Sequence, residues 1–250
     1  LKDTKVNYQN ITKIRALNIK ERNIFMNDPY VYPNGTLKNS AGITNYDELC
    51  QYESNVAAIN LIDIKNEFEG KFDANLFKKL HRHIFSDVYD WAGEYRKVDL
   101  YKEEAVIGGA SLNYAEHNNI SNELNDRIND LNNTNWSNKS QDQICNEFAR
   151  KIALLWKVHP FRDGNTRTTL AFASLFSEEH DFPIDFGKIF AYEQKKFGET
   201  TDSRARIRDC FVLASLEEQN QPEPEHLAYV FKSAMIDKEM KKNEDEEMTR

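Results

Sequence analysis

The strongest constraint on the fold is a short interruption between two helical patterns. Residues 141–157 and 164–178 carry apolar side chains at helical spacing, and each stretch is long enough for several turns. The interruption, residues 159–167, reads His-Pro-Phe-Arg-Asp-Gly-Asn-Thr-Arg. Because a proline disfavours helical backbone in the residue before it, the first helix should end at His159. The sequence therefore predicts a helix, a tight loop and a second helix that begins near Gly164.

Helical spacing extends over most of the remaining chain. We expect further helices over residues 47–66, 74–85, 116–131, 184–195, 202–216 and 224–240. Residues 96–110 differ, because two short β-prone pieces surround a polar tip and are followed by two glycines. The prediction is a mainly α fold, a helical bundle with one small β-hairpin.

Length and composition fit one domain with extensions. The 250 residues are 40% hydrophobic, which is enough for a core, and no repeat or long linker marks a second domain. We expect an N-terminal lead-in over residues 1–45, the folded domain over 46–240 and a charged, solvated tail over 241–250. Because the chain starts with Leu1, we also expect it to be a piece of a longer product.

Charge and cysteine content exclude several classes of protein. The formal net charge is -8, and no basic stripe is present, which argues against nucleic-acid binding. No stretch approaches the roughly 20 apolar residues that a membrane span needs. The three cysteines are far apart and odd in number, so they predict neither a zinc site nor a disulfide framework, and a reducing cytosol is the expected setting.

His159 and Asp163 provide the acid-base and metal-binding chemistry of the loop. A histidine at a helix end has its imidazole on a rigid support, and a pKa of about 6.5 suits removal of a proton from a hydroxyl. Asp163 is the only acid in the loop, and it offers the oxygen ligands that Mg²⁺ prefers beside phosphates. An N-cap for the following helix is the alternative role for Asp163. His81 and His83 have no third ligand nearby, so they do not predict a metal site.

The second half of the loop is suited to anions. Gly164, Asn165 and Thr166 occupy the first turn of the predicted helix, where unpaired amide groups and the positive end of the helix dipole attract phosphate. Arg167 adds a forked donor for phosphate oxygens. A base, a metal ligand and a phosphate cradle within nine positions indicate a site for a nucleoside triphosphate.

Two motifs resemble the Fic family. Its members carry an HPFx(D/E)GNGR loop, which residues 159–167 match except at Thr166, and an upstream HRxIFxDxYxWAGExR stretch, which residues 81–96 match. The resemblance covers residues 47–216 and implies a helical fold with a hairpin over the active-site loop. The reaction that it implies is transfer of AMP from ATP, with Mg²⁺, to a Ser, Thr or Tyr hydroxyl of a target protein.

The resemblance also implies surfaces for the target and for adenine. The expected hairpin would be a flap that holds the target segment by strand pairing, and its charged tip would help to select the target. A solvated tip without a binding role is the alternative. Phe211 lies in a run similar to the helix that lines the adenine pocket of relatives, although a core helix would have the same pattern. The flap residues are Lys102, Glu103, Glu104, Val106, Ile107, Gly108 and Gly109.

The chain departs from the family pattern twice. Thr166 replaces a glycine, and Leu170 replaces an arginine that in many relatives holds the terminal phosphate and pairs with an inhibitory glutamate. A lysine at the Thr166 position accompanies phosphate transfer in the family, so a phosphotransferase is one alternative, and a domain that binds a partner without turnover is another. The chain has no inhibitory motif of the family type, which implies a separate small antitoxin-like inhibitor.

The lead-in has a resemblance of its own. Residues 30–43 are similar to the segment that precedes Fic domains in bacterial type IV-secreted effectors. This similarity implies a protein of the bacterial cytoplasm that a type IV secretion system delivers into a host cytosol. A host small GTPase would then be the protein target.

Overall fold

The computed structural model describes residues 28–236, except 63, 69, 186, 188 and 190–202. The α-helices in this part of the chain are α3 (Tyr46–Leu61), α4 (Ile64–Glu67), α5 (Ala74–Phe85), α6 (Ile120–Asn132), α7 (Gln141–Val158), α8 (Asn165–Glu179), α10 (Ser203–Ala214) and α11 (Glu225–Ala234). The predicted mainly α fold is confirmed. None of the described helices is long and apolar enough to cross a bilayer. Residues 1–27 of the lead-in, the tail over 241–250 and most of the predicted helix over 184–195 lie outside the described residues.

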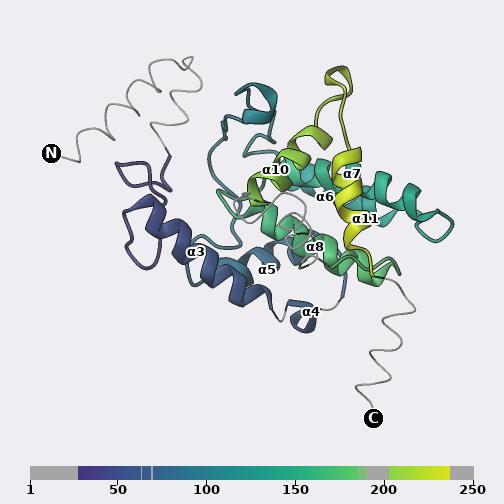
Figure 1. Cartoon of the computed structure of the whole chain (residues 1–250). Helices are drawn as coiled ribbons and strands as arrows, with labels where there is room; N and C mark the ends of the chain where they lie inside the picture. Colours follow the sequence, from purple (N-terminus) through teal and green to yellow (C-terminus); the bar gives the residue numbers. More distant parts are fainter. Residues whose placement is uncertain are drawn as a thin grey trace, which may run out of the picture.

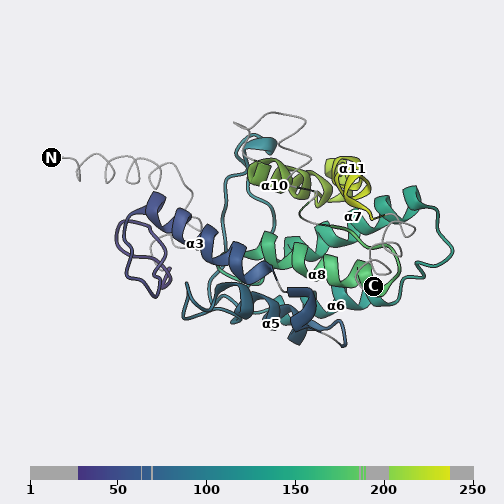
Figure 2. The same ribbon diagram turned by 60° about the horizontal axis from the view of Figure 1, so that its bottom comes forward.

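The helices are arranged in tiers around α7 and α8 (Figure 1). Figure 2 shows α10 and α11 on one side of this central pair and α5 and α6 on the other. Helix α7 contacts α6, α8, α10 and α11, and α5 contacts both α3 and α8. Helix α8 buries every residue from Thr168 to Ser177, as a helix inside the core must. The loop between α7 and α8 is therefore held by the centre of the molecule.

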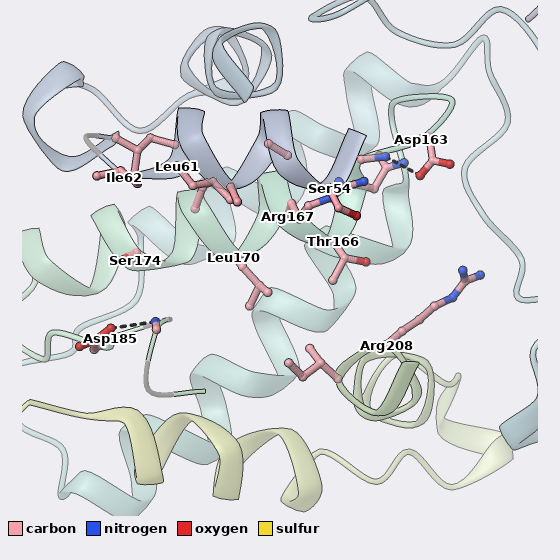
Figure 3. Close-up of a pocket in the computed structure, with 18 of the residues that line it drawn as sticks. Ser54, Leu61, Ile62, Asp163, Thr166, Arg167, Leu170, Ser174, Asp185 and Arg208 are labelled. Atoms are coloured by element: carbon pink, nitrogen blue, oxygen red, sulfur yellow. Dashed lines mark hydrogen bonds between the residues drawn. The ribbon is translucent and has the colours of Figure 1, made fainter. Parts of the chain in front are cut away.

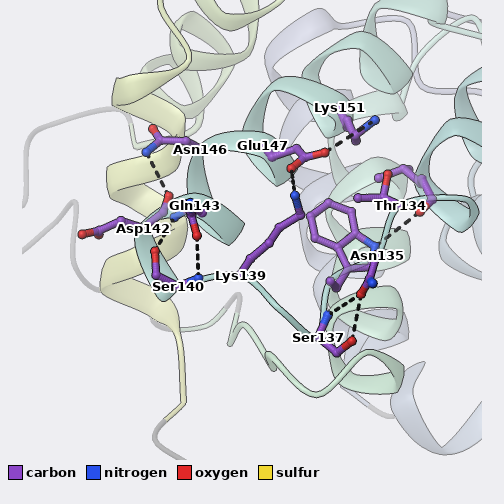
Figure 4. Close-up of polar contacts among 12 residues, drawn as sticks. Thr134, Asn135, Ser137, Lys139, Ser140, Asp142, Gln143, Asn146, Glu147 and Lys151 are labelled. Carbon is purple, nitrogen blue, oxygen red and sulfur yellow. Dashed lines mark hydrogen bonds and ion pairs between the residues drawn. The ribbon is translucent and has the colours of Figure 1, made fainter.

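Side-chain caps fix where the helices begin. Ser140 accepts a hydrogen bond from the Gln143 N–H (3.3 Å), and the Gln143 side chain accepts one from the Ser140 N–H (2.8 Å), so α7 starts with a reciprocal capping box (Figure 4). Asp73 accepts from the Leu76 N–H (2.9 Å) at the start of α5. Such caps each stabilise a helix by about 1 kcal/mol.

Three helices differ from their predicted bounds. Helix α11 ends at Ala234 and not at residue 240, because the backbone of Met235 is extended and forms a β-bridge with Ile184. The pattern over 47–66 forms α3 and the separate turn α4, because α3 ends at Leu61. Helix α6 begins at Ile120 and not near residue 116. The residues before it form a turn, in which the Asn119 N–H bonds the Glu116 carbonyl (2.8 Å) and the His117 N–H bonds an Asp99 carboxylate oxygen (2.8 Å).

The β-hairpin predicted over residues 96–110 is not formed in the structure. Ala105–Ile107 form a 3₁₀ turn, and the backbone of Glu104 pairs with that of Ala110 (3.0 Å) without a ladder of strand hydrogen bonds. The Lys102 N–H donates to the Ser111 side chain (3.2 Å), where a hairpin would need a backbone carbonyl. The segment is a loop closed by its own turn.

Candidate active site

His159 directly follows α7, where its backbone adopts the left-handed conformation (φ 50°, ψ 56°). Its N–H bonds the Trp156 carbonyl (3.0 Å), and its Nδ1 lies 3.3 Å from the same oxygen. Because that contact needs a donor, Nδ1 carries the hydrogen and Nε2 carries the lone pair. Nε2 lies 3.1 Å from the Lys102 Nζ atom. His159 itself is only 3% exposed.

The electrostatic surroundings keep this imidazole neutral. Burial, and then the positive charges of Lys102, Arg208 and Arg96, hold the pKa of His159 well below its ordinary value of about 6.5. Nε2 is therefore unprotonated at neutral pH. The imidazole of His159 is thus neutral in the structure, with its lone pair on Nε2.

Arg96 anchors the beginning of the loop. Its Nε donates to the His159 carbonyl (2.9 Å), and its backbone N–H donates to the Pro160 carbonyl (2.9 Å). The same guanidinium donates to the carbonyls of Val98 (2.7 Å) and Ala115. The Arg96 side chain is fully buried, so these carbonyls satisfy a charge that has little access to water.

Asn165 and His81 hold the middle of the loop. The Asn165 side chain accepts from the Phe161 N–H (2.9 Å) and donates to the Phe161 carbonyl (2.8 Å). Phe161 is buried and stacks on His81, with ring centroids 3.8 Å apart. His81 accepts from the Gly93 N–H (2.8 Å) and donates to the Asp163 carbonyl (3.0 Å), and burial lowers its pKa to about 3. The side chains of both residues thus support the loop from within the protein.

Gly164 allows α8 to start beside the cavity, directly after the loop. Its backbone is left-handed (φ 78°), and a Cβ atom there would lie 2.4 Å from Cε2 of Phe85. Helix α8 then begins at Asn165, and the first amide groups of an α-helix have no partner within it. Residues 164–167 all line one cavity, which is the placement that a phosphate cradle would need.

The carboxylate of Asp163 is influenced by the nearby positive charges of Lys102 and Arg167. Burial of its carboxyl opposes ionisation, but the charges of Lys102 and Arg167, together with the N–H of Gly164, hold its pKa below the ordinary value. The Gly164 N–H donates to Oδ1 (2.6 Å). The side chain is half-buried and accepts no hydrogen bond from the later amides of the helix that would make it an ordinary N-cap in the described residues. It is thus an ionised carboxylate next to the first turn of α8.

Arg167 is oriented by a partner that the sequence did not reveal. Its Nη2 pairs with a carboxylate oxygen of Glu53 on α3, and Tyr89 donates to the other oxygen. The guanidinium also lies 4.5 Å from the centroid of the Phe85 ring. No motif marks Glu53, because the pairing depends on how α3 packs beside α8.

Thr166 has a specific partner in the core. Its Oγ1 accepts a hydrogen bond from the buried Trp156 indole N–H (3.0 Å). The methyl-bearing residue that replaces the family's glycine therefore bonds α8 to α7. Sequence reasoning identified the departure at Thr166 but not the indole that it meets.

The predicted flap tip is turned into the protein. Glu104 is 3% exposed and accepts hydrogen bonds from Arg208 on both oxygens and from the Tyr114 hydroxyl (2.7 Å). Lys102 points at His159, and burial lowers its pKa to about 8. The alternative prediction of a solvated tip is thus wrong for Lys102 and Glu104. Glu103 and the residues of the 3₁₀ turn stay at the outer edge of the loop.

A cavity of about 790 Å³ connects these groups (Figure 3). Its polar end holds the loop and Lys102, and Arg208 extends toward that end from α10. Leu170 and Ala171 of α8 and the facing side of α3 make the other end apolar. The cavity-lining residues of α3 and α4 are Ser54, Ala57, Ala58, Leu61, Ile62, Ile64 and Lys65.

Phe211 is not part of this cavity. It is fully buried and stacks on Trp156, with ring centroids 5.3 Å apart, so in this structure it belongs to the core. Ile207 and Arg208 are the residues of α10 that line the cavity. Helical spacing alone could not distinguish these neighbouring faces of one helix.

Comparisons with known proteins agree with this geometry. The model of the Fic/DOC family matches residues 71–177. The protein adenylyltransferase VbhT of Bartonella schoenbuchensis is 28% identical over 181 residues, which cover 68% of this chain and 35% of VbhT. The "Probable protein adenylyltransferase y4lH" of Sinorhizobium fredii is 31% identical over 172 residues, which cover 68% of this chain and 84% of y4lH. The chain thus spans about a third of the length of VbhT and most of that of y4lH.

A solved structure shares the fold. The BepC protein of Bartonella tribocorum, a VirB-translocated effector crystallised with AMPPNP, superposes with a TM-score of 0.59 at 19% identity. The match covers 88% of this chain and 99% of that chain. The arrangement of helices around the loop is therefore the one found in that protein.

Proposed function

Because this chain belongs to the Fic/DOC family, we propose that it is a protein adenylyltransferase, which moves the AMP part of ATP to a hydroxyl side chain of a protein. The observation that carries the proposal is the unprotonated Nε2 of His159, which faces a cavity lined by the first turn of α8. A base and an anion cradle that share one cavity are what this reaction requires.

His159 is the proposed general base. Its Nε2 would take the proton of the target hydroxyl while the hydroxyl oxygen attacks the α-phosphorus and pyrophosphate leaves. The bond from Nδ1 to the Trp156 carbonyl fixes the tautomer and would stabilise the imidazolium that forms. A positioned base of this kind contributes about 10²- to 10⁴-fold in rate.

The first turn of α8 and Arg167 are the proposed phosphate ligands, and Asp163 is the proposed ligand for Mg²⁺. No group of three or more His, Cys, Asp or Glu side chains forms a metal site among the residues that the structure describes. One carboxylate is enough for Mg²⁺, which typically takes its other oxygens from substrate phosphates and water. Bound there, the ion would neutralise phosphate charge during transfer. The AMPPNP bound to BepC supports ATP as the nucleotide.

The proposed target is a protein with an accessible Ser, Thr or Tyr, and a host small GTPase is the specific expectation. Delivery by a type IV secretion system and control by a small antitoxin-like inhibitor belong to the same proposal. Delivery is supported by the lead-in over residues 30–43 and by the fold shared with the BepC effector. The inhibitor is supported by the lack of an inhibitory motif of the family type in the sequence.

Labelling with [α-³²P]ATP and [γ-³²P]ATP in parallel tests the proposal. Relative to lysate without the protein, host-cell lysate proteins should gain additional α-label and no additional γ-label. Intact-mass spectrometry of the labelled protein should show an adenylyl increment. Transfer of the γ-label would identify the chain as a phosphotransferase, and no transfer of either label would favour a binding domain.

The residue variants sharpen this test. His159→Ala should abolish labelling and leave the calorimetric affinity for ATP nearly unchanged, because the imidazole acts on the hydroxyl and not on the nucleotide. His226→Ala is the matched control, since that imidazole is exposed on α11. Labelling by His159→Ala at the rate of the control would refute the base assignment.

A further inference from the structure

We propose that Lys102 is a phosphate-binding residue that covers the basic nitrogen of His159 in the nucleotide-free protein and leaves it when a polyphosphate enters. This inference rests on the proposed function, since it concerns the nucleotide of the same site. It goes further by giving one side chain two alternative partners and by making the base available only after the nucleotide is bound.

The contact with His159 is of a kind that blocks the base. The ammonium of Lys102 can only donate, and Nε2 of His159 holds the lone pair because Nδ1 is committed to the Trp156 carbonyl. The 3.1 Å contact is therefore an N–H···N hydrogen bond that uses the same lone pair that the target proton needs. As long as this bond persists, the imidazole cannot accept a proton.

The backbone on both sides of Lys102 aims the side chain inward. The N–H of Lys102 donates to the Ser111 hydroxyl, and two residues later Glu104 is fixed by both oxygens to Arg208 on α10. Glu104 also accepts from the Tyr114 hydroxyl. The loop is thus tied at two places, and only the flexible four-carbon stem of the lysine is free to change partner.

Lys102 differs from the other cations around the cavity in what it bonds. Three cavity-lining cations in the described part of the chain pair with carboxylates. These pairs are Lys65 with Glu178, Arg167 with Glu53, and Arg208 with Glu104. The hydrogen-bond partner of Lys102 is a neutral imidazole. A phosphate oxygen is a stronger acceptor for an ammonium than a neutral ring nitrogen, so a polyphosphate at the start of α8 should attract Lys102 first.

A binding order follows from this exchange. Nucleotide must enter before the hydroxyl of the target can be deprotonated, because the entering phosphate removes the ammonium from Nε2. A target that arrives first meets a base whose lone pair is occupied. Lys102 would thus act both as a ligand of the nucleotide and as a positioning residue for the base.

Two measurements on Lys102→Met test the proposal without a protein target. Methionine keeps the length of the stem and removes the charge. Calorimetry with AMPPNP and magnesium chloride should show an affinity about ten-fold lower than that of the wild type, the loss expected for one hydrogen bond to a charged group. In the nucleotide-free protein, carbethoxylation of His159 by diethyl pyrocarbonate, followed by peptide mass spectrometry, should be several-fold faster in the variant, because the lone pair is uncovered.

Lys97→Met is the matched control, because Lys97 is an exposed lysine of the same segment, and it should behave like the wild type in both measurements. If Lys102→Met does not melt cooperatively, Lys102→Gln takes its place. Unchanged AMPPNP affinity would overturn the phosphate contact, and an unchanged carbethoxylation rate would overturn the cover over the base. If the wild type binds AMPPNP and Lys102→Met behaves like it in both measurements, only this inference is contradicted. If the wild type does not bind AMPPNP, the proposed function itself is contradicted.

Discussion

Replacing Thr166 by valine should destabilise the protein through a residue on the neighbouring helix. The indole N–H of Trp156 is fully buried, and its hydrogen-bond partner is the Thr166 hydroxyl at 3.0 Å. Valine has the same shape but cannot accept, so the indole donor is left without a partner. An unpaired buried donor costs roughly 1–3 kcal/mol. With about 2 kcal/mol lost, the melting temperature of a chain of this size should fall by roughly 4–8 °C.

Helix α8 contains a control for this experiment. Thr169 is fully buried, and its hydroxyl has no hydrogen-bond partner within the residues that the structure describes. Thr169→Val should therefore be neutral or stabilising, since it removes an unpaired polar atom without a change in shape. Urea unfolding followed by circular dichroism measures both variants. The reasoning is refuted if Thr166→Val is no more destabilising than Thr169→Val.

A double-mutant cycle isolates the bond itself. Trp156→Phe removes the donor, and the double variant with Thr166→Val removes both partners, so the orphaned group disappears. The coupling free energy from the four proteins should be about 1 kcal/mol.

Transfer chemistry should tolerate a change at Thr166, because the amides of the cradle belong to the backbone. We expect Thr166→Gly to keep AMP as the transferred group and to change the rate by less than about ten-fold, or ~1.4 kcal/mol. A phosphate increment in the wild type that becomes an adenylyl increment in this variant would contradict the choice of reaction.

Three further predictions concern the loop. Asp163→Ala should lose most labelling activity and its dependence on Mg²⁺, because no second loop acid can replace the ligand; titration of activity with magnesium chloride checks this, and an unchanged dependence would place the ion elsewhere. The acid limb of the kcat/KM profile should have its midpoint below pH 6.5, because the buried His159 is lowered in pKa and only the neutral imidazole accepts a proton; a midpoint above that value would argue against this base. Gly164→Ala should destabilise the protein by roughly 3 kcal/mol or more, since the added Cβ would lie 2.4 Å from Phe85 on a left-handed backbone; a melting curve like that of the wild type would show that the loop can shift.

The local features of the chain were predictable because they depend on neighbours in sequence. Helix α5 has the predicted bounds, Ala74–Phe85, with Asp73 as its side-chain cap. The end of α7 before Pro160 and the start of α8 after Gly164 follow from proline sterics and from glycine's freedom to adopt a positive φ. His159 and the first turn of α8 could be placed at one loop for the same reason.

Features that depend on distant contacts were not predictable. The inward turn of Glu104 is set by Arg208, which is 104 positions away, and the pairing of Arg167 is set by Glu53, which is 114 positions away. The apolar character of residues 106–107 suggested a strand, but the Ile107 N–H bonds the Glu104 carbonyl (3.1 Å) within the turn, and the Glu104 side chain is held by Arg208 on α10. A pattern read along one chain contains no information about such partners.

The buried guanidinium of Arg96 joins the catalytic loop to the rest of the domain in a way that should be visible in unfolding. It bonds the carbonyl of His159 and also those of Val98 and Ala115. Opening of the loop alone should be costly, because it would take the His159 carbonyl away from a fully buried charge. Loss of activity and loss of helical signal should therefore occur at the same denaturant concentration, so that a simple activity assay reports the cooperative unfolding of the whole domain.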